Sequence, residues 1–236
     1  MHVAILMPTF NEPLVAETLR AVRARAAGLG GVTVFLVDDG SEPAVAPACF
    51  PEQTAEFRVV LARHIVNLGQ GAALETARQL ALGPYSSPAF AAYVTMDSDG
   101  QHRASDLAAL VRSLDEADVA FGNRFSGDSN VPATRRFILA AARIFERAIT
   151  GVTLSDAHNG FRAFRRDALA SISITENGMA HATEIRVRVA RGGLSVAEVP
   201  VSIRYTRASG ERGQSSLGAL AIVRDLFHRY LFEESK

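Results

Sequence analysis

The segment Tyr93-Val94-Thr95-Met96-Asp97-Ser98-Asp99-Gly100-Gln101-His102 sets a short apolar run directly before a polar turn. The run predicts a buried strand, and the Asp, Ser and Gly residues after it predict a turn at the end of that strand. Asp97 and Asp99 stand one residue apart, so both carboxylates can reach one divalent cation. Asp, Ser and Gly are also ordinary turn formers, and this segment alone does not establish a metal site.

The same order of strand and polar turn occurs twice upstream. An apolar run at residues 3–7 is followed by Asn11-Glu12, and a run at 32–37 leads into Asp38-Asp39. A further strand is predicted at 57–62, and helices are predicted at 13–27, 71–82 and 104–117. Strands that alternate with helices predict an α/β fold with a Rossmann-like, mostly parallel sheet flanked by helices. Its strands end at one rim, where such sheets bind ligands, so the acidic turns should gather there.

The second half of the chain continues this pattern without a convincing linker. Strands are predicted at 119–122, 160–164 and 196–205, and helices at 135–150 and 182–190. We therefore expect one catalytic domain over residues 1–216. Residues 217–236 carry Leu220, Val223, Phe227 and Tyr230 at helical spacing, which predicts an amphipathic helix that is part of this domain or peripheral to it.

Composition excludes several classes of protein. The sequence has 236 residues, and Lys plus Arg equal Asp plus Glu at 25 each, so no nucleic-acid partner is expected. Cys49 is the only cysteine, which excludes an internal disulfide and a cysteine-rich zinc site and favours a reducing compartment. No apolar run reaches the roughly 18 residues that a membrane-spanning helix needs. A cytoplasmic location, peripheral at the inner face of the cytoplasmic membrane if the substrate is a lipid, is expected.

Several motifs, taken together, resemble those of a known enzyme family. Four motifs are similar in order and spacing to those of family-2 glycosyltransferases with the GT-A fold. They are Pro8-Thr9-Phe10-Asn11-Glu12, Val37-Asp38-Asp39-Gly40-Ser41, Asn67-Leu68-Gly69-Gln70-Gly71 and Asp97-Ser98-Asp99-Gly100-Gln101-His102. Three later motifs resemble those of the polyprenol-phosphate sugar transferase branch, typified by dolichyl-phosphate mannosyltransferases. They are Phe121-Gly122-Asn123-Arg124-Phe125, Asp156 with Asn159-Gly160-Phe161-Arg162-Ala163-Phe164, and Glu198-Val199-Pro200-Val201. The resemblance covers nearly the whole chain.

The resemblance implies a set of donor and metal residues. Residues implied to bind the nucleotide sugar, a UDP- or GDP-sugar, are Pro8, Asn11, Glu12, Asp38, Asp39, Asn67, Gly69, Gly71 and Asp97. Residues implied to bind Mg²⁺ or Mn²⁺ are Asp97, Asp99 and Gln101. His102 is expected to pack or to stabilise the turn rather than to act as a ligand.

The residues implied to act in catalysis are Asp99, Arg124, Glu184 and Arg204. Arg124 and Arg135 match the grip on the acceptor phosphate, although Leu139 stands where those enzymes usually carry Ser. Glu184 is the only carboxylate where hydroxyl-directed members carry an acidic pair that supplies the base. Arg204 belongs to a segment that resembles a flap over the donor phosphates.

The expected activity is inverting, metal-dependent transfer of a hexose to a polyprenyl phosphate or a related cell-envelope lipid, with a small membrane-spanning partner as a possible anchor. One alternative is a saccharide hydroxyl acceptor in polysaccharide biosynthesis, and another is a catalytically silent GT-A partner subunit. The chain has no Trp, so the Gln-x-x-Arg-Trp motif of processive synthases is absent. A nicotinamide site at Gly69-Gln70-Gly71 is disfavoured, since Leu74 stands at the third fingerprint position.

Overall fold

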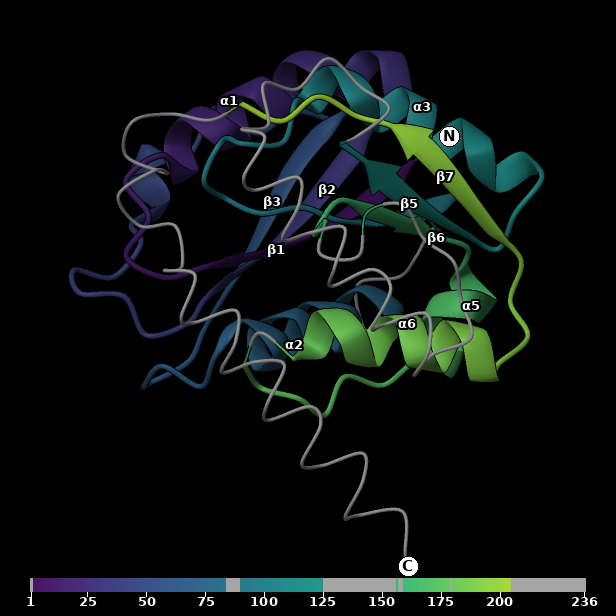
Figure 1. The fold of residues 1–236 in the computed structure, drawn as a ribbon. Helices are drawn as coiled ribbons and strands as arrows, with labels where there is room; N and C mark the ends of the chain where they lie inside the picture. The colour runs from purple at the N-terminus through teal and green to yellow at the C-terminus, as the bar shows by residue number, and fades with distance from the viewer. Residues whose placement is uncertain (1, 84–89, 125–155, 157–158, 179, 205–236) are drawn as a thin grey trace, which may run out of the picture. The chain divides into compact units, whose positions relative to one another are not determined.

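A seven-stranded sheet forms the centre of the computed structural model, which describes residues 2–83, 90–124, 156, 159–178 and 180–204 (Figure 1). The strands are β1 (Val3–Thr9), β2 (Val32–Asp38), β3 (Phe57–Arg63), β4 (Ala92–Thr95), β5 (Val119–Asn123), β6 (Arg162–Phe164) and β7 (Val196–Pro200). The α-helices are α1 (Val15–Ala26), α2 (Gln70–Leu82), α3 (Leu107–Arg112), α5 (Arg166–Ser171) and α6 (His181–Arg191).

The sheet has the order β3-β2-β1-β4-β6-β5-β7 and is mostly parallel. β1 pairs in parallel with β2 on one side and with β4 on the other, and β2 pairs in parallel with β3. β6 runs antiparallel to both β4 and β5, while β7 is parallel to β5. This topology confirms the predicted α/β class, and it brings the ends of β1, β2 and β4 to one rim.

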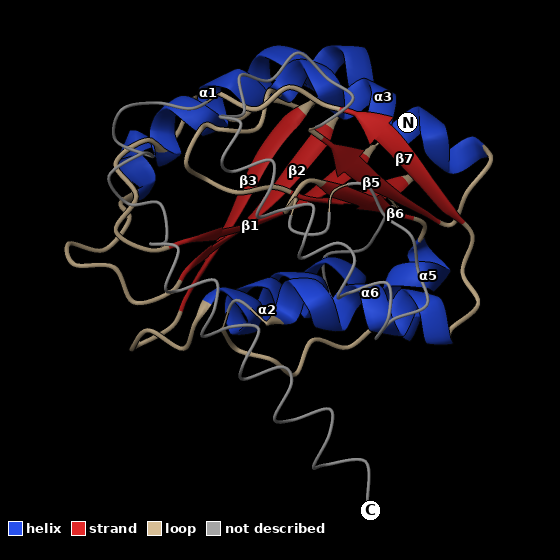
Figure 2. Ribbon diagram, in the orientation of Figure 1, coloured by secondary structure: helices blue, strands red, loops and turns tan. Residues whose placement is uncertain are grey.

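Helices cover both faces of the sheet, as Figure 2 shows. On one face, Ile5 and Met7 of β1 belong to an apolar cluster with residues of α1 and α3, such as Leu19. On the other face, Leu6 belongs to a cluster with residues of α2, α5 and α6, such as Leu74. Because β1 is buried on both sides, it reads as a continuous apolar run rather than an alternating one.

The predicted elements that fall within the described residues agree with the structure except at some of their ends. The helix predicted at 104–117 is a short α-helix, α3, between two 3₁₀ turns, Ala104–Asp106 and Ser113–Asp115. In the second turn the hydroxyl of Ser113 donates to the carbonyl of Leu110, a bond that competes with regular helix. The strand predicted at 196–205 ends at Pro200, where its partner β5 also ends.

Other segments differ or fall outside the description. α5 was not expected from the sequence. The helix predicted at 135–150 and the C-terminal helix predicted at 217–236 lie outside the described residues. Among the residues that the structure describes, no helix is both long enough and apolar enough to cross a bilayer.

Candidate functional site

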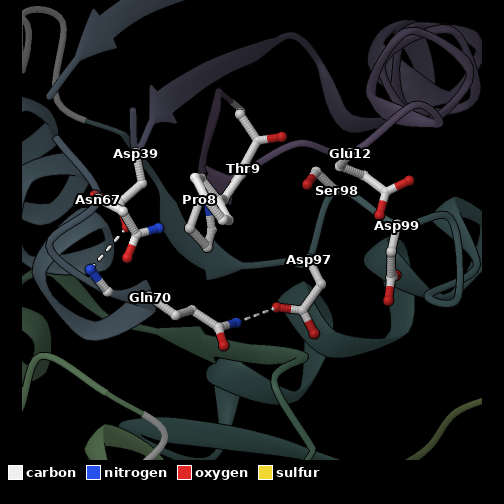
Figure 3. Close-up of a pocket in the computed structure, with 11 residues that line it drawn as sticks. Pro8, Thr9, Glu12, Asp39, Asn67, Gln70, Asp97, Ser98 and Asp99 are labelled. Carbon is white, nitrogen blue, oxygen red and sulfur yellow. Dashed lines mark hydrogen bonds between the residues drawn. The ribbon is translucent and has the colours of Figure 1, made fainter. Parts of the chain in front are cut away.

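A cavity of about 520 Å³ opens at the rim where β1, β2 and β4 end. Thr9 at the end of β1 is in register with Asp38 at the end of β2, so the turns that follow these strands are neighbours. The lining consists of Pro8, Thr9, Phe10, Glu12, Asp39, Asn67, Gly69, Gln70, Asp97, Ser98 and Asp99. In Figure 3, Asp39, Asn67 and Gln70 lie on one side, Glu12, Ser98 and Asp99 lie on the other, and Pro8 and Thr9 lie between them.

Asp97 and Asp99 form the acidic side of the cavity. Asp97 Oδ1 accepts a hydrogen bond of 2.9 Å from Nε2 of Gln70 (Figure 3). Asp99 accepts from the backbone N–H of Gln101 at 3.0 Å and from its Nε2 at 2.5 Å. Gln101 therefore orients the carboxylate of Asp99.

The pKa values of both carboxyls are raised. Burial raises the pKa of Asp97 and outweighs the lowering effect of the charges of His181, Arg162 and Arg124 and of the Gln70 hydrogen bond. Burial also raises the pKa of Asp99, and the negative charge of Asp97 raises it further. Two carboxylates that oppose each other's ionisation in this way are stabilised by a cation placed between them.

The Asp97 and Asp99 pair fits an ion such as Mg²⁺ or Mn²⁺ that takes its remaining ligands from the substrate and from water. It does not fit a metal ion enclosed by protein ligands alone. Within the described ranges, no cluster of three or more His, Cys, Asp or Glu residues could enclose a metal ion. Asp97 and Asp99 offer hard oxygen ligands, and the side-chain oxygen of Gln101 is a further candidate. Magnesium is commonly bound in this manner, through one or two carboxylates with substrate phosphates and water completing the coordination.

His102 contacts the backbone of the acidic turn and an aromatic ring. Its Nδ1 accepts the backbone N–H of Asp97 at 3.2 Å, and its ring stacks on Phe161 with the ring centroids 4.9 Å apart. Burial lowers the pKa of His102 to about 4, so the ring is neutral at physiological pH. These contacts match the packing and turn role expected of His102.

Asp38 and Asp39 have different surroundings despite being adjacent. Asp39 lines the cavity, where its carboxylate accepts the N–H groups of Leu68 and Gly69 at 3.0 and 2.8 Å. Nδ1 of His64 lies 2.6 Å from Oδ1 of the same carboxylate. Asp39 therefore holds the loop after β3 against the end of β2.

Asp38 is not part of the cavity lining. Its carboxylate accepts the N–H groups of Ser41 and Val45 at 2.9 and 3.0 Å. Burial alone would raise the pKa of Asp38, but hydrogen bonds from Ser41 and Val45 and the charge of Arg63 hold it below the usual value. In the structure, Asp38 shapes the turn that presents Asp39.

Asn11 and Gly71, like Asp38, are not among the residues that line the cavity. The N–H of Asn11 donates to Oγ of Ser41 at 2.9 Å, and its Oδ1 accepts the N–H of Glu42 at 2.9 Å. A Cβ on Gly71 would stand 1.8 Å from the carbonyl oxygen of Glu176, so only glycine fits there. The predicted donor residues that do line the cavity are Pro8, Glu12, Asp39, Asn67, Gly69 and Asp97.

Four lining residues were not singled out from the sequence, namely Thr9, Phe10, Gln70 and Ser98. Each lies inside one of the motifs quoted above, so its place in that motif is the feature of the sequence that could have identified it. Thr9 is 3% exposed, and among the described residues its Oγ1 has no hydrogen-bond partner. A buried hydroxyl of this kind is costly unless a ligand completes it.

Of the arginines implied to act on the acceptor or in catalysis, the structure describes Arg124 and Arg204 but not Arg135. The backbone N–H and Nε of Arg124 donate to Oδ2 of the buried Asp156 at 3.0 and 2.6 Å. The N–H of Arg204 donates to the carbonyl of Gln101 at 2.9 Å, so this exposed arginine adjoins the acidic turn. Arg135 lies outside the described residues.

Glu184 does not line the cavity. Its carboxylate accepts the N–H groups of Thr175 and Glu176 at 3.0 and 2.9 Å and pairs with Arg188 at 2.9 Å. Burial would raise the pKa of Glu184, but hydrogen bonds from Thr175, Glu176 and Arg188 hold it below the usual value. A carboxylate engaged in this way is a weak proton acceptor.

Comparison with known proteins agrees with this geometry. Residues 4–173 match the sequence profile described as Glycosyl transferase family 2. The undecaprenyl-phosphate mannosyltransferase of Micrococcus luteus is 27% identical over 227 residues, which cover 92% of this chain and 88% of that protein. The polyprenol monophosphomannose synthase of Mycolicibacterium smegmatis is 28% identical over 210 residues, which cover 84% and 76%.

Solved glycosyltransferases share the fold. Glucosyl-3-phosphoglycerate synthase from Mycobacterium tuberculosis, in complex with Mn²⁺ and UDP-glucose, superposes with a TM-score of 0.62 at 16% identity, covering 98% of this chain and 78% of that one. S. aureus TarS 1-349 gives a TM-score of 0.57 at 15% identity, covering 100% and 73%. With the family profile matching most of the chain, this chain belongs to glycosyl transferase family 2 and is a GT-A glycosyltransferase similar to polyprenol-phosphate sugar transferases.

Proposed function

We propose that this glycosyltransferase moves a hexose from a UDP- or GDP-sugar to a polyprenyl phosphate or a related cell-envelope lipid, with inversion at the anomeric carbon and with Mg²⁺ or Mn²⁺ as cofactor. The observation that carries the proposal is that the cavity has two chemically different sides. Asp39 and Asn67 lie on one side, where the nucleoside is proposed to bind, and Asp97 and Asp99 lie on the other.

The acidic side is proposed to hold the diphosphate through the metal. Asp97 and Asp99 are the candidate ligands, with Gln101 orienting Asp99. When bound, the ion neutralises the charge that develops on the departing nucleoside diphosphate. Arg204 adjoins this turn and would add positive charge at the same place. The solved relatives that contain Mn²⁺ or Mg²⁺ together with UDP support this assignment.

The surroundings of Glu184 favour a phosphate acceptor over a sugar hydroxyl. A sugar hydroxyl needs a base, whereas a lipid monophosphate is already ionised at neutral pH and needs mainly to be held and aligned. The carboxylate that the sequence offered as a base, Glu184, accepts hydrogen bonds from Thr175 and Glu176, which argues against that role. Direct attack by the acceptor phosphate on the anomeric carbon inverts its configuration in one displacement.

Arg124 is proposed to hold the acceptor phosphate. Asp156 fixes this arginine through both its backbone N–H and its Nε, which limits the freedom of the guanidinium. Arg135 remains a second candidate for the same phosphate. The names of the relatives, which include undecaprenyl-phosphate mannosyltransferase and polyprenol monophosphomannose synthase, support a lipid phosphate.

Assays of the purified full chain test the acceptor. A panel of UDP- and GDP-sugars is incubated with Mn²⁺ and with polyprenyl phosphate, a free saccharide or no acceptor, and the lipid product is measured. Arg124→Ala is expected to raise the KM for polyprenyl phosphate by about tenfold or more, with a smaller change in nucleotide affinity, because a charge-assisted contact is lost. Arg112→Ala, at an exposed position, is the matched control.

Transfer to a saccharide with no response to polyprenyl phosphate would contradict the proposed acceptor. We also propose that the enzyme acts at the inner face of the cytoplasmic membrane, and co-sedimentation with anionic liposomes tests whether it binds a lipid surface. The proposal does not require a membrane-spanning partner, for which the described residues give no argument.

A further inference from the structure

Residues 174–178, called here the strap, lie against the amino end of α2. The N–H of Gly71 donates to the carbonyl of Asn177 at 2.8 Å. A Cβ on Gly71 would stand 1.8 Å from the carbonyl oxygen of Glu176, and one on Gly69 would stand 2.3 Å from that of Asn177. The strap backbone therefore occupies the space where side chains at these two positions would lie.

Two carboxylates hold the strap by its backbone. Glu75 of α2 accepts the N–H of Ile174 at 2.9 Å. Glu184 of α6 accepts the N–H groups of the next two residues, Thr175 and Glu176, at 3.0 and 2.9 Å, and the Thr175 hydroxyl at 2.5 Å. Consecutive backbone donors are thus satisfied by charged acceptors, which form stronger hydrogen bonds than neutral ones.

Each of these carboxylates is itself fixed by an arginine one helical turn further on. Arg78 pairs with Glu75 at 2.8 Å, and Arg188 pairs with Glu184 at 2.9 Å. The strap is therefore held between α2 and α6 rather than resting on one helix.

The contacts continue from the strap into the cavity. Gly69 and Gln70, at the start of α2, both line it. The N–H of Gly69 donates to Asp39 at 2.8 Å on the nucleoside side, and Nε2 of Gln70 donates to Asp97 at 2.9 Å on the acidic side. A shift of the strap would move the amino end of α2 and disturb both contacts.

We propose that Glu184 and Glu75 are positioning residues of the donor site, which act through the strap on Gly69 and Gln70. The inference rests on the proposed function for the identity of the ligand, but not for the contacts. It replaces the role of base that the sequence suggested for Glu184, and it assigns Glu75, which no motif marked, to the same task.

Nucleotide binding and steady-state kinetics of Glu184→Ala and Glu75→Ala test the proposal, with UDP and GDP as probes in the presence of Mn²⁺. Both variants are expected to raise the nucleotide Kd and the donor KM by about tenfold, to lower kcat less, and to keep the shape of the pH profile. Loss of a catalytic base would instead lower kcat by about 10²- to 10⁴-fold at unchanged Kd and remove the acidic limb of the profile. That second result would overturn the proposal.

Asp118→Ala is the matched control, because Asp118 holds a turn in the same way, through the N–H and hydroxyl of Ser195 at 2.9 and 2.6 Å, but does not line the cavity. It should leave the nucleotide Kd unchanged, and an equal rise in its Kd would overturn the proposal. Thr175→Val removes the hydroxyl contacts to Glu184 and Arg188 but keeps the backbone contact, and it serves if the alanine variants do not fold. A smaller rise in Kd, about twofold, is expected for it, and an unchanged Kd would contradict the proposal.

Amide hydrogen exchange gives a readout that needs no ligand. In Glu184→Ala the Gly71 amide should lose protection, since its acceptor belongs to the strap, and in Asp118→Ala it should not. Unchanged protection in Glu184→Ala would refute the strap contact. If the wild-type chain binds neither nucleotide while the Gly71 result holds, the proposed function fails and the mechanical link stands.

Discussion

The surroundings of Asp99 oppose the ionisation of its carboxyl group, since burial and the neighbouring Asp97 both raise its pKa. Replacing it with Asn removes the negative charge of this proposed metal ligand but keeps an acceptor for the N–H of Gln101. We expect Asp99→Asn to fold normally and to lose transfer by about 10- to 100-fold or more, as changes around metal ligands do. Mn²⁺-dependent transfer and thermal unfolding measure this, with the exposed Asp115→Asn as control. Near-normal turnover of the variant with Mn²⁺ would refute the metal assignment.

The raised pKa values of Asp97 and Asp99 also predict a pH dependence of stability. Both carboxyls hold their protons to higher pH in the folded chain than in the unfolded chain, whose value is near 3.8. Their contribution to the free energy of unfolding therefore falls as pH rises from about 4 through the raised values. If the proposed metal site binds Mn²⁺ through the ionised pair, the rise in Tm on adding Mn²⁺ should be larger at pH 8 than at pH 5. An equal rise at both pH values, or the same rise in Asp99→Asn, would contradict this.

Thr9 lines the cavity, and its buried hydroxyl has no hydrogen-bond partner among the described residues. We expect a bound nucleotide to complete its hydrogen bond. Thr9→Val should then weaken nucleotide binding by about fivefold to tenfold, the effect of losing one hydrogen bond, without lowering the stability of the free chain. Thr9→Ser should bind like the wild type. Thr33→Val is the control, because the hydroxyl of Thr33 is 2.9 Å from His2 Nε2 and outside the cavity lining. Unchanged affinity of Thr9→Val would show that the hydroxyl does not contact the nucleotide.

At the scale of elements, the turn after β2 depends on Gly40. Its φ is +80°, and an added Cβ would stand 2.6 Å from the backbone carbon of Val66 in the loop after β3. Gly40→Ala is therefore expected to lower the free energy of unfolding by more than about 1 kcal/mol. Gly28→Ala, where a Cβ would meet nothing within 4 Å, should be neutral or slightly stabilising. Denaturant unfolding of both variants measures the difference, and equal effects would contradict the argument.

The sequence predicts elements well where a periodic apolar pattern meets a polar break. The ends of β1 and β2 are predicted to within two residues, because buried runs stop at acidic turns there. α5 is short, and its two buried residues, Ala168 and Leu169, make no periodic pattern that a sequence alone could reveal. The antiparallel direction of β6 is also invisible locally, since direction depends on which strands lie beside it.

At the scale of the whole molecule, the motifs locate the rim of the sheet but not the direction in which each side chain points. Asp38 and Asp39 are equivalent in the sequence, yet only Asp39 lines the cavity, because the turn closes around the carboxylate of Asp38. Glu184 is expected from the sequence to supply a base, yet its carboxylate accepts a hydrogen bond from the strap. The strap lies far along the chain from α2, so no spacing argument connects them.

The position of β6 has a consequence for synthesis on the ribosome. Strands β1 to β4 are contiguous in the sheet, so this part can assemble once β4 has left the exit tunnel. β5 is made next, but in the described sheet its neighbours are β6 and β7, both of which are translated later. Until β6 enters between β4 and β5, the nascent chain exposes an unpaired apolar strand and a bare sheet edge, which favour aggregation. Chains stalled after β5 should therefore need chaperones more than chains released after β7.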